Sequence, residues 1–247
     1  GRYIAYRSMA RAGYEADKYD LKVYDRQNGK TTLLTEGVDR SVDEILWTKD
    51  GKRLLFTAQD GVYKSLFEVP VGGGDVLRVI KGMLELQYQH MDTVQVVELG
   101  TYRHDFRLHP DGERLVFLGE RQNYPTEVMS IRYDGKRLSD IRQITTTNKA
   151  LLDSIDMPSP ESFTFKSFDG AEVQGWIIVP PCFDAKKKYP MIYLVHGGPQ
   201  GVWADNFHYR WNTARFAAPG FVVVAVNCRG SVGFGQRSGR ESCRARV

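Results

Sequence analysis

Along residues 1–150, short runs of alternating apolar and polar residues are separated by polar turns that contain glycine. Alternation with a period of two is typical of strands with one buried face, and Asn-Gly or Asp-Gly between two such runs predicts a hairpin. We therefore expect strands that pair as follows: residues 21–24 with 31–35, 63–69 with 76–80, and 127–133 with 141–145. The pattern predicts an all-β segment.

Two stretches of this segment are similar to each other, which indicates a repeated unit. Residues 47–57 and 108–118 each contain a strand end, a polar tip with Asp-Gly, a basic residue and an apolar strand. A recurring tip favours the blades of a partial β-propeller, with a further incomplete blade at residues 1–35. The two copies lie further apart than the about 40–50 residues of one blade, so we expect an insertion within residues 81–103. A β-sandwich is the alternative.

After residue 150, continuous apolar runs replace the alternation. Residues 191–195 and 221–226 predict strands that are buried on both faces, and apolar residues at helical spacing between them predict a helix over 207–218. Residues 162–165 and 173–179 predict an antiparallel pair that precedes them. Strand, helix and strand in this order are typical of a largely parallel α/β sheet.

These patterns divide the chain into three parts. We expect a partial propeller over residues 1–150 and the N-terminal part of an α/β domain over 151–236. Residues 237–247 have no apolar pattern, and we expect this tail to result from a frameshift, a gene-model error or a truncation. Most of the net positive charge of the chain lies in this tail, which contains four arginines and one glutamate, whereas the whole chain has a net charge of +4.

The first apolar run of the α/β part ends at a turn, His196-Gly197-Gly198-Pro199. Glycines let backbone N–H groups approach a ligand oxygen closely, and donors at the end of a strand can stabilise an oxyanion. A tight turn without a ligand is the alternative. We expect His196 and Gly197 to shape this loop, with His196 orienting it rather than acting as a base. Arg229 is expected to brace the neighbouring loop through backbone carbonyls.

Composition and charge limit the classes of partner that we expect the chain to bind. The chain has 34 Lys and Arg against 30 Asp and Glu, interleaved along the sequence, so we expect no nucleic-acid partner. No apolar run approaches the about 18 residues of a membrane-spanning helix, and no membrane partner is expected. Cys182, Cys228 and Cys243 lack metal-ligand spacing, and the glycines of 230–235 do not form a dinucleotide fingerprint. We expect neither a metal nor a cofactor, and the compartment and oligomeric state stay open.

The order and spacing of several motifs resemble those of the prolyl oligopeptidase family of serine peptidases, in its dipeptidyl peptidase and acylaminoacyl peptidase branch. The motifs are Phe163-Thr-Phe-Lys166, Gln174-Gly175-Trp176, Lys188-Tyr189-Pro190, the run 196–201, Tyr209-Arg-Trp-Asn212 and the run 227–236. Upstream, Met9–Asp17 is similar to a segment of the dipeptidyl peptidase branch. The resemblance covers residues 1–236 and implies a β-propeller followed by an α/β-hydrolase domain that cleaves short peptides with a Ser-His-Asp triad.

The resemblance also implies roles for single residues. Gly198 takes the place of the backbone donor to the oxyanion, and Glu15 and Asp17 are candidates to hold the free amine of a peptide. For these two acids, a solvated loop beside Arg11 and Lys18 is the alternative.

The nucleophile of this fold stands in G-x-S-x-G, and no serine of the sequence does. We therefore expect the triad to lie outside these 247 residues and the chain itself to be inactive. A non-catalytic propeller binding module and an esterase- or lipase-type hydrolase are the alternative functions.

Overall fold

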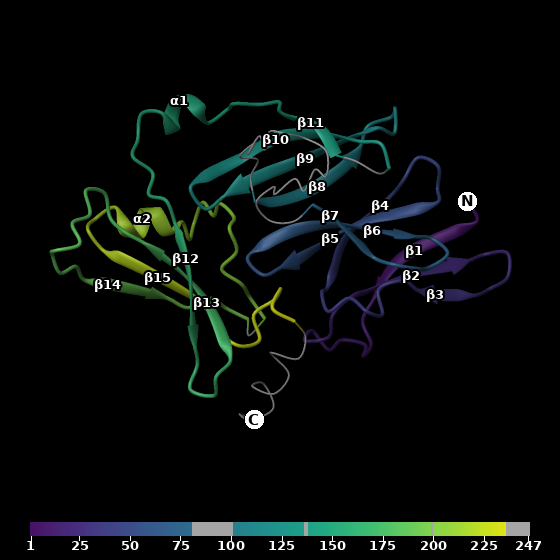
Figure 1. Cartoon of the computed structure of the whole chain (residues 1–247), viewed down its shortest axis with the longest axis horizontal. Helices are drawn as coiled ribbons and strands as arrows, with labels where there is room; N and C mark the ends of the chain where they lie inside the picture. Colours follow the sequence, from purple (N-terminus) through teal and green to yellow (C-terminus); the bar gives the residue numbers. More distant parts are fainter. Residues whose placement is uncertain (81–100, 136–137, 199, 236–247) are drawn as a thin grey trace, which may run out of the picture.

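The computed structural model describes residues 1–80, 101–135, 138–198 and 200–235, and four β-sheets contain almost all of their regular structure (Figure 1). The first three sheets are antiparallel, and their strands follow one another in chain order. Sheet one contains β1 (Tyr3–Ser8), β2 (Asp20–Asp25) and β3 (Thr31–Leu33). Sheet two contains β4 (Val42–Trp47), β5 (Arg53–Asp60), β6 (Tyr63–Pro70) and β7 (Leu77–Ile80). Sheet three contains β8 (Tyr102–Leu108), β9 (Arg114–Arg121), β10 (Tyr124–Tyr133) and β11 (Leu138–Gln143).

The expected hairpins are confirmed, and the repeated Asp-Gly tips have the same geometry. Gly51 and Gly112 both adopt positive φ, +66° and +78°, which glycine accepts without steric cost. At each tip the aspartate accepts a hydrogen bond from the backbone two residues on, at 3.0 Å for Asp50 and 2.8 Å for Asp111. The expected insertion lies largely outside the described residues, because these omit 81–100.

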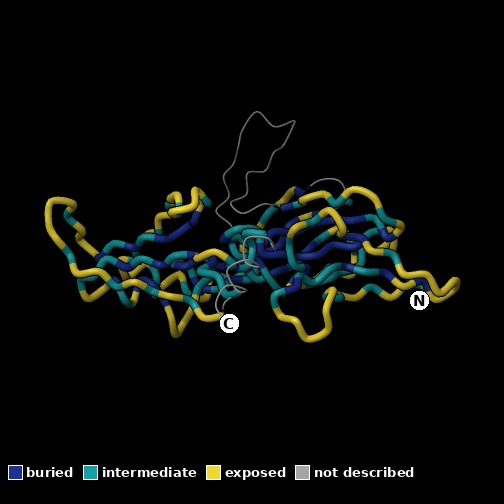
Figure 2. Tube along the Cα trace, turned by 90° about the horizontal axis from the view of Figure 1, so that it is seen from below, coloured by how far each residue is buried: buried dark blue, intermediate teal, exposed yellow. Residues whose placement is uncertain are grey.

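Two apolar cores hold the first three sheets together. One core joins sheets one and two, and the other joins sheets two and three. Phe56 stacks on Phe67 in the first core with ring centroids 5.2 Å apart, and Phe106 stacks on Phe117 in the second at 4.9 Å. Buried stretches accordingly concentrate in this half of the molecule (Figure 2). Within the described residues the three sheets do not close into a ring.

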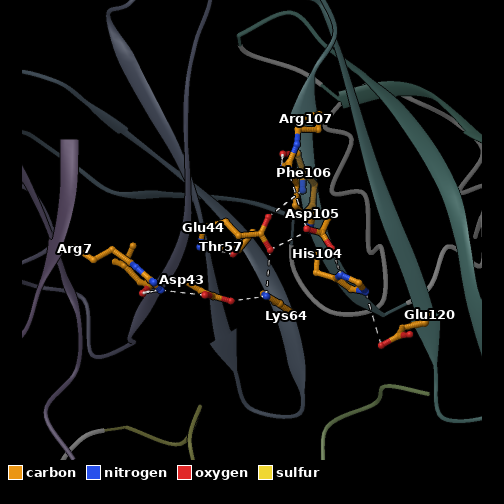
Figure 3. Close-up of polar contacts among 11 residues, drawn as sticks. Arg7, Asp43, Glu44, Thr57, Lys64, His104, Asp105, Phe106, Arg107 and Glu120 are labelled. Carbon is orange, nitrogen blue, oxygen red and sulfur yellow. Dashed lines mark hydrogen bonds and ion pairs between the residues drawn. The ribbon is translucent and has the colours of Figure 1, made fainter. Parts of the chain in front are cut away.

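A charged seam crosses from sheet two to sheet three through two bulges (Figure 3). Asp105 adopts φ +54°, and the N–H groups of Asp105 and Phe106 donate to the two carboxylate oxygens of Glu44 at 3.0 and 2.9 Å. Lys64 lies 3.2 Å from Glu44 and also pairs with Asp43. Burial alone would lower the pKa of Lys64, but Asp43, Tyr102 and Glu44 outweigh it and raise the pKa.

The fourth sheet has a different topology. After the short helix α1 (Lys149–Leu152) come β12 (Glu161–Lys166), β13 (Glu172–Ile178), β14 (Met191–Leu194), the helix α2 (Thr213–Ala217) and β15 (Val222–Asn227). The sheet order is β12-β13-β15-β14, with β14 parallel to β15 and the other pairs antiparallel. Neither helix in the described part of the chain is long and apolar enough to cross a membrane.

Two expectations for this sheet are wrong. The strand β14 is not buried on both faces, because it is an edge strand; Met191 is 62% exposed and Tyr193 is 52% exposed. The helix expected over 207–218 is only α2, which begins where the Asn212 side chain accepts hydrogen bonds from the N–H groups of Ala214 and Arg215. An N-cap of this kind stops the helix from extending toward its N-terminus.

A loop residue, Asp205, makes several of the hydrogen bonds that tie the part of the chain with the fourth sheet to the other sheets. Its N–H donates to the carbonyl of Val62 at 2.9 Å, and its carboxylate accepts from the N–H of Gln122 at 3.1 Å and from the hydroxyl of Thr101. A second tie lies nearby, where the N–H of Gly61 donates to the Gly233 carbonyl at 2.8 Å. These contacts position the loops that follow β14 and β15 against the turns of sheets two and three.

Candidate functional site

The turn after β14 requires glycine at some positions and not at others. Gly198 adopts φ +136°, and a Cβ there would lie 2.3 Å from the Gln200 nitrogen. A Cβ on Gly201 would lie 2.3 Å from the Gly197 carbonyl oxygen, whereas one on Gly197 would meet nothing within 4 Å. None of the described residues accepts a hydrogen bond from the Gly198 N–H. The turn therefore presents a backbone donor that is available to a ligand oxygen.

His196 ties this turn to the loop after β15. Its Nε2 lies 2.8 Å from the Ser231 hydroxyl oxygen, and its Nδ1 lies 3.0 Å from the Gly197 carbonyl. Ser231 is buried, and its hydroxyl also lies 2.7 Å from the Cys228 carbonyl. The Cys228 thiol is 3.8 Å from the same His196 nitrogen. Both ring nitrogens are thus occupied by loop contacts, which is what an orienting residue does.

Arg229 reaches a different partner from the one expected. Its guanidinium pairs with the carboxylate of Asp169, in the turn between β12 and β13, rather than with backbone carbonyls. The N–H of Ala171 donates to Asp169 at 3.2 Å, and this bond together with the charge of Arg229 holds the pKa of the Asp169 carboxyl below its ordinary value. The loop after β15 is thereby braced against the hairpin of the same sheet.

A first cavity, of about 270 Å³, lies between the β1–β2 connection and the loop after β15. Glu15 and Asp17 both line it, together with Gln200 of the glycine turn and Ser231. Their environments differ. The Asp17 carboxylate is buried and accepts three hydrogen bonds from Arg11, at 2.7, 2.9 and 3.0 Å. Glu15 is exposed and makes no hydrogen bond or ion pair with a described residue, so its carboxylate is available to a cation.

A second cavity, of about 560 Å³, lies beside the glycine turn. His196 and Gly197 form part of its wall, and the loop residues 201–213 form most of the rest. The backbone of Trp203 holds this loop in place. Its backbone N–H donates to the side-chain oxygen of Asn227 at 2.7 Å, and its backbone carbonyl accepts from the indole N–H of Trp176 at 2.8 Å. The volume lies within the range of small-molecule sites.

The loop that lines the second cavity contains the motif Tyr209-Arg-Trp-Asn212, but its sequence alone does not mark it as a site. His208, Arg210 and Trp211 stand there without a spacing typical of catalysis or metal binding. Besides that motif, the signal that points to a binding surface is a cation between two aromatic residues in an irregular segment. Among the described residues, no cluster of His, Cys, Asp and Glu is arranged to hold a metal ion.

The chain is similar to known peptidases over nearly its whole length. It is 32% identical over 238 residues to dipeptidyl-peptidase 5 of Porphyromonas gingivalis, a match that covers 96% of this chain and 31% of that protein. No family model matches the sequence. The chain spans about a third of the length of the relatives it matches.

Solved structures agree with the sequence match. An acylaminoacyl peptidase of Pyrococcus horikoshii superposes with a TM-score of 0.74 at 26% identity, over 97% of this chain and 33% of that one. An acylaminoacyl peptidase in complex with Z-Gly-Gly-Phe-chloromethyl ketone superposes equally well, with a TM-score of 0.74 at 25% identity, and the match covers 97% of this chain and 33% of that chain. The sequence match and the superposed folds together lead to one conclusion: over nearly its whole length the chain is similar to part of a serine peptidase of the prolyl oligopeptidase family.

Proposed function

We propose that the chain is part of a serine peptidase that hydrolyses short peptides, of the dipeptidyl or acylaminoacyl type. The observation that carries this proposal is the available N–H of Gly198, in a turn whose Gln200 lines a cavity, in a chain that is similar to dipeptidyl-peptidase 5 over 96% of its length. The peptide ligand of one superposed acylaminoacyl peptidase supports a short peptide as the substrate class.

In this proposal residues 1–150 form propeller blades, residues 151–236 form the start of an α/β-hydrolase domain and residues 237–247 form a tail. The tail lies outside the described residues. The parallel pair of β14 and β15, with α2 between them in the chain, supports the assignment of the second part. The propeller would then limit access to the cavities at its boundary with the hydrolase part.

The proposed mechanism divides the work between this chain and residues outside it. The N–H of Gly198 would donate to the oxyanion that forms when a serine attacks the peptide carbonyl, a contribution of about 3–4 kcal/mol for one donor. The serine, its histidine base and its aspartate belong to segments that the 247 residues do not contain. His196, Gly197 and Arg229 would hold the donor in place through their loop contacts.

Recognition of a free amine would fall to Glu15 rather than to Asp17. Both acids line the first cavity, but the Asp17 carboxylate already accepts three hydrogen bonds from Arg11. An exposed carboxylate on a cavity wall is suited to an ammonium group. In this proposal Asp17 therefore shapes the segment that presents Glu15.

A graft tests the proposed function. Residues 1–236 replace the matching third of the Porphyromonas gingivalis dipeptidyl-peptidase 5, and the chimera is assayed with a dipeptidyl, an N-acyl-aminoacyl and a short-chain ester substrate. We expect turnover of the dipeptidyl or the N-acyl-aminoacyl substrate and little of the ester. A folded chimera that cleaves only the ester, or nothing, would contradict the proposal. The 247-residue chain by itself should cleave none of them.

Glu15→Gln in the same chimera tests the amine site. The change should raise KM for the free-amine dipeptidyl substrate by about tenfold and leave KM for an N-acylated substrate unchanged, because only the former contains an ammonium group. Glu36→Gln is the matched control, since Glu36 is also exposed but does not line either cavity. An unchanged KM for the free-amine substrate would remove Glu15 from the proposed mechanism.

A further inference from the structure

The wall of the second cavity contains hydrogen-bond donors and positive charge but no carboxylate. Arg210 and His208 line it, together with His196, whose ring nitrogens are both occupied by loop contacts, and no Asp or Glu of the described residues does. The guanidinium of Arg210 lies 5.4 Å from the ring centre of Trp211 and forms no ion pair with any described residue. A cavity of this composition favours an anion.

Two buried donors in the same wall have no acceptor. The Gln122 side chain is 6% exposed, and its oxygen accepts from the Thr213 hydroxyl at 3.2 Å, so its amide nitrogen is the group that has no partner. The indole N–H of Trp203 is also buried without a hydrogen-bond partner in the described part of the chain. Buried donors without acceptors are costly and uncommon. This wall is therefore short of acceptor atoms.

His208 adds a donor whose direction is fixed by the backbone. Its Nδ1 accepts the N–H groups of Arg210 and Trp211 at 3.1 and 3.0 Å. A ring that accepts at Nδ1 has its proton on Nε2. His208 is exposed, so this second nitrogen can donate to a ligand beside the Arg210 side chain.

The two cavities differ in the charged groups that are available to a ligand. The first is lined by Lys18 and Arg40, which already pair with Asp20 and Asp60, and by the available carboxylate of Glu15. The second contains Arg210 and the donors described above. A peptide that reaches both cavities would therefore place its amine in the first and an anionic group in the second. The group of a short peptide that meets this requirement is its C-terminal carboxylate.

We propose that the second cavity binds the C-terminal carboxylate of the substrate, through Arg210 and His208, so that the preferred substrates are short peptides with a free C-terminus. This inference rests on the proposed function and adds the substrate class and the site for the leaving part of the peptide. Binding, rather than turnover, tests it in the chain as it exists.

The experiment follows the indole N–H signals of the ¹⁵N-labelled 247-residue chain by NMR. Two of the four tryptophans, Trp203 and Trp211, line the second cavity, whereas Trp47 lies in sheet two. The probes are Gly-Phe-Gly, its C-terminal amide and Gly-Phe-Asp-amide, which has its carboxylate on a side chain. Gly-Phe-Gly should shift the signals of Trp203 and Trp211 but not that of Trp47, and both amides should bind about tenfold more weakly, since a charged hydrogen bond is lost.

Substitutions at Arg210 identify the group that binds the carboxylate. Arg210→Gln should weaken binding of Gly-Phe-Gly about tenfold and leave the affinity for its amide unchanged. Arg210→Lys should retain part of the preference for Gly-Phe-Gly over its amide. Arg215→Gln is the matched control, because Arg215 is exposed on α2 and does not line the cavity.

Each contrary outcome has a separate meaning. Equal affinities for the acid and the amide would overturn carboxylate recognition without touching the proposed function, which is decided by turnover of the chimera. Equal affinities for Gly-Phe-Gly and Gly-Phe-Asp-amide would overturn the preference for the C-terminus. No response from Trp203 or Trp211 to any probe would overturn the site itself.

Discussion

At the scale of single residues, the two glycines of the turn after β14 differ in what they require. Gly198 has a positive φ and no room for a Cβ, whereas Gly197 has space around its Cα and needs no unusual φ. The sequence predicts that a turn with two glycines presents a backbone donor. Which glycine is indispensable depends on where Gln200 and Gly201 return to the turn, and the spacing of residues does not contain that information.

Alanine at these two positions provides the first prediction. Gly198→Ala should lower the free energy of unfolding of the chain by about 1–3 kcal/mol, because the new Cβ combines an unfavourable φ with a clash against backbone. Gly197→Ala should change it by less than about 0.5 kcal/mol. Urea denaturation of both variants measures the difference. Equal destabilisation by the two substitutions would contradict the geometry of the turn.

At the scale of elements, the sequence predicts where strands form more reliably than it predicts which neighbouring elements cover them. Alternation and Asp-Gly tips define the hairpins of the first three sheets, because both signals are local. The edge position of β14 is not local: an apolar run looks the same whether or not a neighbour covers it, and here Met191 and Tyr193 are exposed. The expected helix over 207–218 is shortened by the Asn212 cap, which competes with helical spacing in the same segment.

The seam between sheets two and three yields a second prediction, from two neighbouring acids (Figure 3). Glu44→Ala should lower the free energy of unfolding by about 1–3 kcal/mol, because the N–H groups of Asp105 and Phe106 lose their acceptor. Asp43→Ala should cost less than about 1 kcal/mol, since the Asp43 side chain is 48% exposed and makes only ion pairs. Denaturation with urea measures both. If Asp43→Ala lowered the free energy of unfolding more than Glu44→Ala does, the ion pairs of Asp43, and not the hydrogen bonds from the bulge to Glu44, would be the main stabilisation of the seam.

The brace between Arg229 and Asp169 should depend on pH. The pKa of Asp169 is lowered in the folded chain by the N–H of Ala171 and by Arg229. A lowered carboxyl pKa adds stability above the ordinary Asp value of about 4, and this stability is lost as the pH falls through the folded value. Arg229→Gln should therefore be less stable than the unmodified chain at pH 7 and equally stable near pH 2. Thermal unfolding at both pH values is the measurement, and a difference that persists at pH 2 would exclude Asp169 as its source.

At the scale of the whole molecule, the contact between the fourth sheet and the first three sheets is the part that sequence patterns predict least. Asp205 stands in a loop that resembles ordinary solvated chain, yet it contacts three segments that are far away in the sequence, at Val62, Thr101 and Gln122. A single acid has no periodicity, so nothing in its neighbourhood marks it. The second cavity depends on the same contact, because residues 201–213 form most of its wall.

Removal of Asp205 tests whether this one residue joins the two parts. Burial, with Arg121 contributing, lowers the pKa of Arg103 to about 9, and the charge of Asp205 opposes that shift, so Asp205 stabilises the charged form of Arg103. Asp205→Ala should lower the free energy of unfolding by about 1–3 kcal/mol, and the amides of loop 201–213 should exchange faster than those of β13 and β15. Asp156→Ala is the matched control, because Asp156 is exposed between α1 and β12.

The comparison of the two variants decides between a local and a long-range role for Asp205. If Asp205 only stabilises its own loop, hydrogen exchange should rise in residues 201–213 alone. If it joins the fourth sheet to the first three sheets, exchange should rise also at Thr101 and Gln122, whose side chain and backbone lose their acceptor. We expect the second result, because hydrogen bonds from three segments of these sheets and their turns meet at this residue. Unchanged exchange at Thr101 and Gln122 would show that the parts are held together without Asp205.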